Sequence, residues 1–234
     1  MELKSIAKIL FIDIETVSQK PSFGLLSERY QELWTKKVEQ IKKNAEDTPE
    51  SLYPRSAIYA EFGKIVCISL GFFSEGRFKL RSLYGHDEKR ILNDFATLLN
   101  RKNIAQEYSL CAHNGKEFDF PYVARRMVIH GIPIPTLLQV AGKKPWETSF
   151  IDTMELWKFG DYKSYTSLDL LTECLGIPTP KDDIEGSMVG KVYWEDGDID
   201  RISKYCQKDV LAMARVYCRY QGIPLVADDI VDYN

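Results

Sequence analysis

The residues from Lys8 to Thr16 constrain the fold of this chain more than any other stretch of its sequence. They read Lys-Ile-Leu-Phe-Ile-Asp-Ile-Glu-Thr, and a short run of apolar and β-branched residues of this kind predicts a buried β-strand. Asp13 and Glu15 lie two positions apart at its end, so both carboxylates leave the strand on the same face. Like charges held close together repel unless a cation lies between them. The pair therefore indicates a site for a hard divalent metal, with a solvated strand end as the alternative.

The net charge limits the functions that this chain can have but leaves nucleic-acid binding open. The 234 residues carry a net charge of only −3, so the chain as a whole does not strongly attract polyanions. An acidic site that holds cations can nevertheless attract phosphate groups. Two local basic stretches, Lys36–Lys43 and Arg125–Arg126, are expected to be solvated helix faces.

The cysteines and the apolar runs indicate a reducing compartment. The five cysteines form neither a Cys-x-x-Cys pair nor a zinc-ligand spacing, and most of them lie in apolar runs. This predicts reduced, buried thiols. Residues Met1–Ser5 lack the apolar core of a signal peptide, and no apolar run approaches the ~18 residues of a membrane span. We therefore expect a cytoplasmic protein with no membrane association.

Hydrophobic periodicity predicts an α/β protein with a mixed central β-sheet flanked by helices. Further strands are expected at Lys64–Phe73, Phe78–Tyr84, Tyr108–His113 and Phe150–Thr153, and helices at Asp87–Asn103, Pro121–Ile129, Leu168–Leu175 and Ile199–Val216. We take residues 1–234 as one domain, because this length suits a single hydrophobic core.

A helical insertion is predicted at about residues 20–55, between the first strand and the second. Apolar residues from Leu26 to Ile41 recur at helical spacing, and the polar stretch that follows breaks at Thr48-Pro49. The inserted segment Ser22–Ser51 either lies over the path of a substrate or packs as an outer helix.

A further acid, Asp119, follows the strand predicted at Tyr108–His113. Pro121 suits the first position of a helix, which would place Asp119 just before that helix and make Phe120 its cap. The helix dipole favours a carboxylate at this place, and the strand–turn–helix geometry directs it towards the sheet edge where the first two acids emerge. A simple capping role is the alternative.

Other polar residues in this half of the chain have less specific roles. His113 is expected to be a hydrogen-bonded structural residue, and Asn114 could hold either backbone or substrate. Asp152 and Asp169 suit caps or turns. The stretch Lys181–Gly190 is expected to be a polar loop, mobile and on the substrate side.

The last predicted helix carries a tyrosine and an acid four residues apart, Tyr205 and Asp209. Residues at i and i+4 lie one turn apart on the same helix face. If this face packs on the sheet edge, Asp209 becomes the fourth carboxylate of the site and Tyr205 its neighbour. Otherwise the pair is ordinary surface chemistry.

An Asp-x-Glu on the first strand, an Asn-x-x-x-x-Asp at a strand-to-helix turn and a Tyr-x-x-x-Asp on the last helix occur in this order. The arrangement resembles the DEDD superfamily of 3′–5′ exonucleases, whose ribonuclease H-like fold gathers four carboxylates around two metals. Lys204 stands where the histidine branch carries its histidine, whereas Tyr205 fits the tyrosine (DEDDy) branch. The stretches Asp13–Thr16, Glu61–Val66 and His113–Gly115 look most similar to free-standing bacterial exonucleases related to the proofreading domain of family B DNA polymerases.

This resemblance implies a role for each matching residue. Asp13 would bridge two divalent ions, Mg²⁺ or Mn²⁺, with Glu15 and Asp209 on the ion that carries the attacking water. Asp119 would act on the second ion largely through water, and Tyr205 would orient the nucleophilic water.

Three residues beside these acids are expected to contact the substrate. Thr16 would meet the 3′-terminal nucleotide, and Asn114 would hold substrate. Phe118 or Phe120 would stack on the last bases, with core packing as the alternative and one of the two expected in the core.

The expected activity is a metal-dependent 3′–5′ exonuclease that releases nucleoside monophosphates from single-stranded DNA, with recruitment by a partner protein. An exoribonuclease or oligonucleotide-trimming enzyme of the same fold is the first alternative, because the sequence does not separate DNA from RNA. The second is a catalytically silent nucleic-acid-binding module, although such modules usually lose at least one of the carboxylates.

Overall fold

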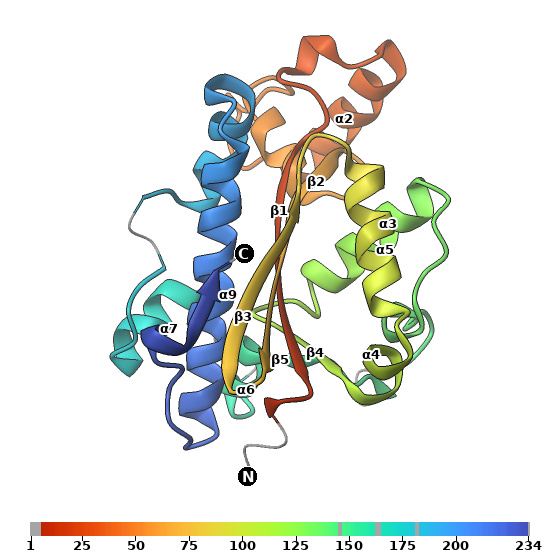
Figure 1. The fold of residues 1–234 in the computed structure, drawn as a ribbon. Helices are drawn as coiled ribbons and strands as arrows, with labels where there is room; N and C mark the ends of the chain where they lie inside the picture. Colours follow the sequence, from red (N-terminus) through yellow and green to blue (C-terminus); the bar gives the residue numbers. More distant parts are fainter. Residues whose placement is uncertain (1–5, 145–146, 162–164, 181–182, 234) are drawn as a thin grey trace.

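A six-stranded mixed sheet forms the centre of the computed structural model, which describes residues 6–144, 147–161, 165–180 and 183–233 (Figure 1). The strand order is β5-β4-β1-β2-β3-β6. The strands are β1 (Ile9–Ser18), β2 (Gly63–Ser74), β3 (Arg77–Tyr84), β4 (Ser109–Ala112), β5 (Ile151–Asp152) and β6 (Val231–Tyr233). β1 is antiparallel to β2 and parallel to β4, β2 is antiparallel to β3, and the outer pairs β4–β5 and β3–β6 are parallel. The expected mixed α/β fold is confirmed.

Helices cover both faces of this sheet. Their bounds are α2 (Glu28–Ile41), α3 (Glu88–Leu99), α4 (Lys102–Glu107), α5 (Asp119–Ile129), α6 (Thr153–Lys158), α7 (Leu168–Leu175), α8 (Val189–Lys191) and α9 (Ile199–Tyr220), with a π-helical turn at Val192–Asp196. The long α9 lies along one face against β1, β2 and β3, whereas α3 and α5 cover the other face (Figure 1).

The alternation of side chains along β1 decides which of its residues face α9. The ring centroids of Phe11 and Tyr217 are 5.8 Å apart, and Cys206 contacts Asp13. Because both partners belong to α9, the odd-numbered side chains of β1 point towards this helix. Phe11 is fully buried there. The two acids of β1 are therefore held beneath a helix that otherwise covers an apolar core.

The segment after β1 folds against the end of the sheet. α2 and the 3₁₀ helix Tyr53–Ile58 bury a small separate cluster around Trp34, whose indole N–H donates to the carbonyl of Pro49 at 2.8 Å. The amphipathic helix expected here is thus present, and the 3₁₀ helix contacts β1.

Several sequence-based expectations are corrected by the structure. α5 begins at Asp119 with Phe118 as its N-cap, so Asp119 lies in the first turn and Phe120 is a buried core residue, not the cap. The helix expected at Asp87–Asn103 ends at Leu99, because a second short helix, α4, follows it.

Two more expectations hold only in part, because polar composition does not guarantee exposure. Arg126 is not on a solvated face: it is 4% exposed and pairs with a buried acid. Within Lys181–Gly190, residues 181 and 182 lie outside the described residues. In the rest of that stretch Ile184 and Val189 are buried, and a 3₁₀ turn occupies Gly186–Met188.

Candidate active site

The strand acids lie where β1 extends beyond its neighbour β4. The last recorded β1–β4 pair is Phe11 with Cys111, and β4 ends at Ala112. Past this point the backbone N–H of Ile14 donates to Oδ1 of Asp119 at 3.2 Å, in the place of a strand hydrogen bond. The end of a short strand therefore brings a carboxylate from α5 to the backbone of the residue between the two acids of β1.

Another acid, Asp152, stabilises the loop that precedes Asp119. Its carboxylate accepts hydrogen bonds from the backbone N–H groups of Asn114 at 2.9 Å and Lys116 at 3.0 Å, and it also caps α6 through Met154. The capping role expected for Asp152 is confirmed. Gly115 is required in this loop, because a Cβ there would lie 2.2 Å from the Cβ of Ala112.

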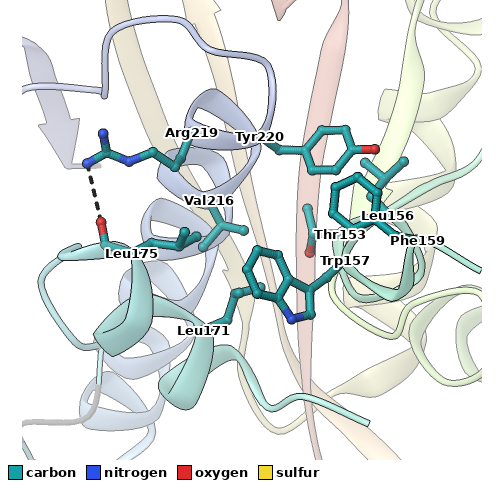
Figure 2. Close-up of a pocket in the computed structure, with 9 residues that line it drawn as sticks. All are labelled: Thr153, Leu156, Trp157, Phe159, Leu171, Leu175, Val216, Arg219 and Tyr220. Carbon is teal, nitrogen blue, oxygen red and sulfur yellow. Dashed lines mark hydrogen bonds between the residues drawn. The ribbon is translucent and has the colours of Figure 1, made fainter. Parts of the chain in front are cut away.

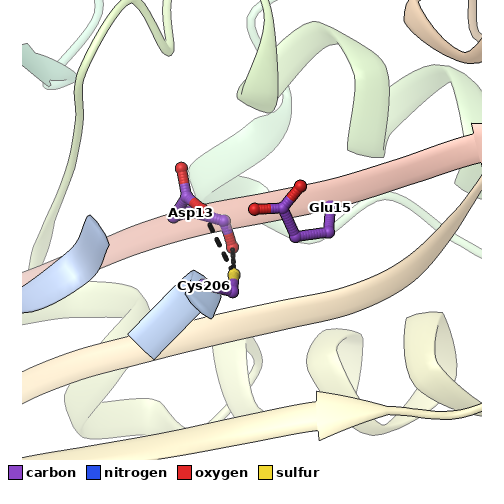
Figure 3. A group of neighbouring side chains, drawn as sticks. All are labelled: Asp13, Glu15 and Cys206. Carbon is purple, nitrogen blue, oxygen red and sulfur yellow. Dashed lines mark hydrogen bonds between the residues drawn. The ribbon is translucent and has the colours of Figure 1, made fainter. Parts of the chain in front are cut away.

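The helix α9 contributes three neighbouring groups. Tyr205 is 6% exposed and hydrogen-bonds Asp209, one turn further along the helix. Cys206 donates its thiol to Oδ2 of Asp13 at 3.2 Å and to the Asp13 carbonyl at 3.4 Å (Figure 3). The sequence alone predicts no site role for Cys206. The available signal was its position beside Tyr205 on the apolar stripe of a helix that covers the acids.

The carboxylate cluster, by which we mean Asp13, Glu15, Asp119 and Asp209, concentrates negative charge in a partly buried place: Glu15 and Asp119 are buried, and Asp13 and Asp209 are half-buried. Burial and the charges of Asp209 and Asp119 raise the pKa of Asp13 well above its ordinary value. Burial and the charge of Asp13 do the same for the pKa of Glu15. Burial also raises the pKa of Asp119 to about 7, although backbone N–H groups partly oppose this shift.

The cluster fits divalent cations. In the part of the chain that the structure describes, Asp13, Glu15 and Asp119 are paired with no lysine or arginine. Such a group must either take up protons or bind cations. Its donors are carboxylate oxygens, the ligands that Mg²⁺ and Mn²⁺ prefer. Asp13, Glu15, Asp119 and Asp209 could therefore hold metal.

The remaining predicted residues lie on the same segments as the acids of the cluster. Thr16 follows Glu15 at an irregularity in the β1–β2 register. Phe118 is half-buried, with its ring 5.3 Å from that of Tyr122. Asn114 has a left-handed backbone (φ 62°), and its side-chain oxygen is buried with no hydrogen-bond partner among the described residues.

His113 contacts the hydroxyl of Thr153 and the carbonyl of Thr166, both at 2.9 Å. This agrees with the structural role expected for it.

A separate apolar pocket lies towards the C-terminal end of α9, between α6, α7 and α9 (Figure 2). Trp157, Leu171, Val216 and Tyr220 are among its lining residues. No carboxylate lines this pocket among the described residues, so it lacks the metal donors of the cluster on β1.

Sequence comparison identifies the class of protein to which this mixed α/β fold belongs. Residues 57–228 match the family described as a predicted 3′–5′ exonuclease related to the exonuclease domain of PolB. The match covers most of the chain, and the chain belongs to this family of enzymes, which are hydrolases acting on nucleic acids. Asp119, Tyr205 and Asp209 lie inside the matched range, whereas Asp13 and Glu15 precede it.

Structure comparison supports the fold. The family B DNA polymerase from the hyperthermophilic archaeon Pyrobaculum calidifontis matches 90% of this chain with a TM-score of 0.56 and 17% sequence identity. The chain spans 24% of that polymerase. The likeness is consistent with the ribonuclease H-like fold. The comparison with curated protein sequences gives no match. Among the described residues, no helix is both long and apolar enough to cross a membrane.

Proposed function

We propose that this protein is a metal-dependent 3′–5′ exonuclease of the DEDDy type, which releases nucleoside monophosphates from the 3′ ends of single-stranded DNA. One observation carries the proposal: the carboxylates of Asp13, Glu15 and Asp119, the last two of them buried, have no basic partner among the described residues. They meet a tyrosine and a fourth acid from α9. A structural acid cluster would be destabilising without compensation. A metal site explains why these acids are held together.

In this proposal the carboxylate cluster holds two divalent ions, Mg²⁺ or Mn²⁺. When bound, the ions stabilise the attacking and leaving oxygens of an in-line displacement at phosphorus. The chain's own residues hold and orient the reactants. Burial and the charge of Asp209 raise the pKa of Tyr205, so its hydroxyl stays protonated at neutral pH. Tyr205 therefore positions a water molecule through a hydrogen bond and does not act as a base.

The same proposal assigns substrate contacts around the cluster. Thr16 meets the terminal nucleotide, and Asn114 holds substrate from the loop that precedes Asp119. Phe118, which is half-buried beside Asp119, offers a ring edge to the last base. We further propose that residues 1–234 work as one exonuclease domain in the cytoplasm, with the insertion at 20–55 beside the substrate path and a partner protein for recruitment.

The test is digestion of a 5′-labelled single-stranded DNA oligomer with Mg²⁺ or Mn²⁺. The wild type is expected to give a ladder that shortens from the 3′ end. Asp13→Asn is expected to lower the rate at least about a hundredfold, the usual effect of removing one preorganised electrostatic group. The exposed acid Asp94 provides a matched control, since Asp94→Asn removes a surface charge that lies 3.8 Å from Arg90.

A matched RNA oligomer, run in parallel, tests the sugar preference. Equal cleavage by wild type and Asp13→Asn, or undiminished cleavage in EDTA, contradicts the proposed function. If wild type leaves both DNA and RNA intact, the proposal is overturned in favour of a silent binding module.

A further inference from the structure

The thiol of Cys206 lies inside the proposed metal site. Its Sγ is 3.2 Å from Oδ2 of Asp13, and one ligand atom each from Asp13, Glu15 and Cys206 lie within 4.8 Å of one another (Figure 3). Figure 3 shows the three side chains meeting between β1 and α9. Two oxygen donors and one sulfur donor are thus already grouped before any ion binds.

The environment of the Glu15 carboxylate indicates that a ligand binds at this place. Glu15 is 7% exposed, and among the described residues it has no hydrogen-bond or ion-pair partner, only the charges of neighbouring acids. A buried acid without a partner is destabilising unless a cation approaches it. The cation that fits best is one that uses all three nearby donors.

We propose that Asp13, Glu15 and Cys206 form a second binding mode of this site, which takes a borderline divalent cation such as Zn²⁺ through two carboxylates and one thiolate. Zinc accepts such mixed donors, with Zn–S near ~2.3 Å and Zn–O near ~2.0 Å. Tetrahedral bonds of these lengths place the donor atoms roughly 3.3–3.5 Å apart. The pair formed by Sγ of Cys206 and Oδ2 of Asp13 already lies close to this spacing, at 3.2 Å.

The ligand atoms distinguish this binding mode, which includes a thiolate, from the binding of two ions by carboxylates alone in the proposed function. Mg²⁺ and Mn²⁺ favour oxygen and gain little from sulfur, whereas Zn²⁺ and Co²⁺ bind thiolate well. Binding exchanges the thiol proton, now donated to Asp13, for the metal, and this proton leaves to solvent. The bound ion occupies Asp13 and Glu15, so Zn²⁺ inhibits turnover. Only this inhibitory consequence rests on the proposed function.

Cobalt absorption reads the thiolate directly and needs no substrate. We would use a Cys174→Ser background, which removes the one exposed thiol among the free cysteines, in buffer without thiol reductants. Titration with Co²⁺ is expected to give a near-ultraviolet sulfur-to-cobalt charge-transfer band. Cys206→Ser should abolish this band. Cys218→Ser, which changes a buried cysteine of the same helix, should leave it unchanged.

A measurement on the unmutated chain covers the case in which Cys206→Ser fails to fold. X-ray absorption of the zinc-loaded protein should show one sulfur neighbour at ~2.3 Å. A shell of oxygen and nitrogen only, or a cobalt band of equal strength with and without Cys206, overturns the inference.

Enzyme inhibition supplies the final comparison. The zinc concentration that halves Mg²⁺-supported cleavage should rise at least tenfold in Cys206→Ser; no change would overturn the inhibitory role. If the wild type shows the cobalt band but cleaves nothing with Mg²⁺, the proposed function fails while the thiolate mode stands.

Discussion

Two buried groups of charged residues in this protein differ in how their acids are compensated. In the Glu88 cluster, formed by Glu88, Arg126 and His130, the carboxylate accepts hydrogen bonds from Nε of Arg126 at 2.8 Å, His130 at 2.7 Å and the backbone of Ile65 at 2.7 Å. Arg126 also donates to the carbonyl of Ala60 at 2.8 Å. In the carboxylate cluster, Asp13, Glu15 and Asp119 have no cationic partner among the described residues.

The comparison shows that burial alone does not decide what an acid does. Glu88 and Glu15 are almost equally buried, at 6% and 7% exposure. The Arg126 guanidinium and its hydrogen bonds hold the pKa of Glu88 below its ordinary value against the effect of burial, whereas the pKa of Glu15 is raised. The first acid joins α3, α5 and β2 into one structure. The second has no such partner among the described residues.

Removal of Glu88 is expected to have the largest effect on stability. Glu88→Ala leaves the buried guanidinium of Arg126 without its carboxylate, and breaking one side of a buried ion pair costs about 3–5 kcal/mol. Urea unfolding of wild type and variant measures this loss, if the unfolding free energy depends on urea concentration with the same slope in both proteins.

The carboxylate cluster supplies the control for the Glu88→Ala variant. In a chelating buffer Asp13→Asn removes a charge from a repelling group, so its unfolding free energy should equal or exceed that of wild type. A loss as large as that of Glu88→Ala would mean that Asp13 is compensated by a group in the protein, and the contrast between the two clusters would fail.

The sequence predicted the parts of the site that depend on local periodicity. Alternation along one strand was enough to place Asp13 and Glu15 on one face, and helical spacing was enough to pair Tyr205 with Asp209. The same periodicity should have shown that Arg126 is buried, because it follows Tyr122 by four residues on the covered face of α5. Its charge was taken as a sign of exposure, and its partner lies 38 residues away in sequence.

Features that depend on contacts distant in sequence were not predictable. β6 is a three-residue strand that exists only because it pairs with β3, far earlier in the chain. The contact of Cys206 with Asp13 likewise joins residues 193 positions apart. No local pattern specifies which residue of a strand an apolar helix position will meet.

The pH dependence of stability should differ between the clusters. The pKa of Asp119 rises from 3.8 to about 7 on folding, so the folded, metal-free protein holds this proton more tightly than the unfolded chain. The resulting stabilisation is present below pH 4 and is lost as the pH rises towards 7. It amounts to at most about 4 kcal/mol, since one pKa unit corresponds to about 1.4 kcal/mol.

The measurement is the unfolding free energy of wild type minus that of Asp119→Asn, in EDTA, between pH 4 and pH 8. The difference should fall across this range, and saturating Mn²⁺ should reverse the fall by binding the ionised cluster. A difference that rises with pH would show that Asp119 has a cationic partner, as Glu88 does.

The smallest expected effect concerns His130, the outer member of the Glu88 cluster. His130→Ala removes one hydrogen bond to the charged Glu88, worth about 1.5 kcal/mol, and leaves the bond from Arg126 intact. The His130 side chain is 25% exposed, so water can replace part of its contribution and the loss should be smaller than that of Glu88→Ala. Urea unfolding of both variants at the same pH tests this order. An equal loss would identify the histidine, not the arginine, as the group that allows Glu88 to be buried.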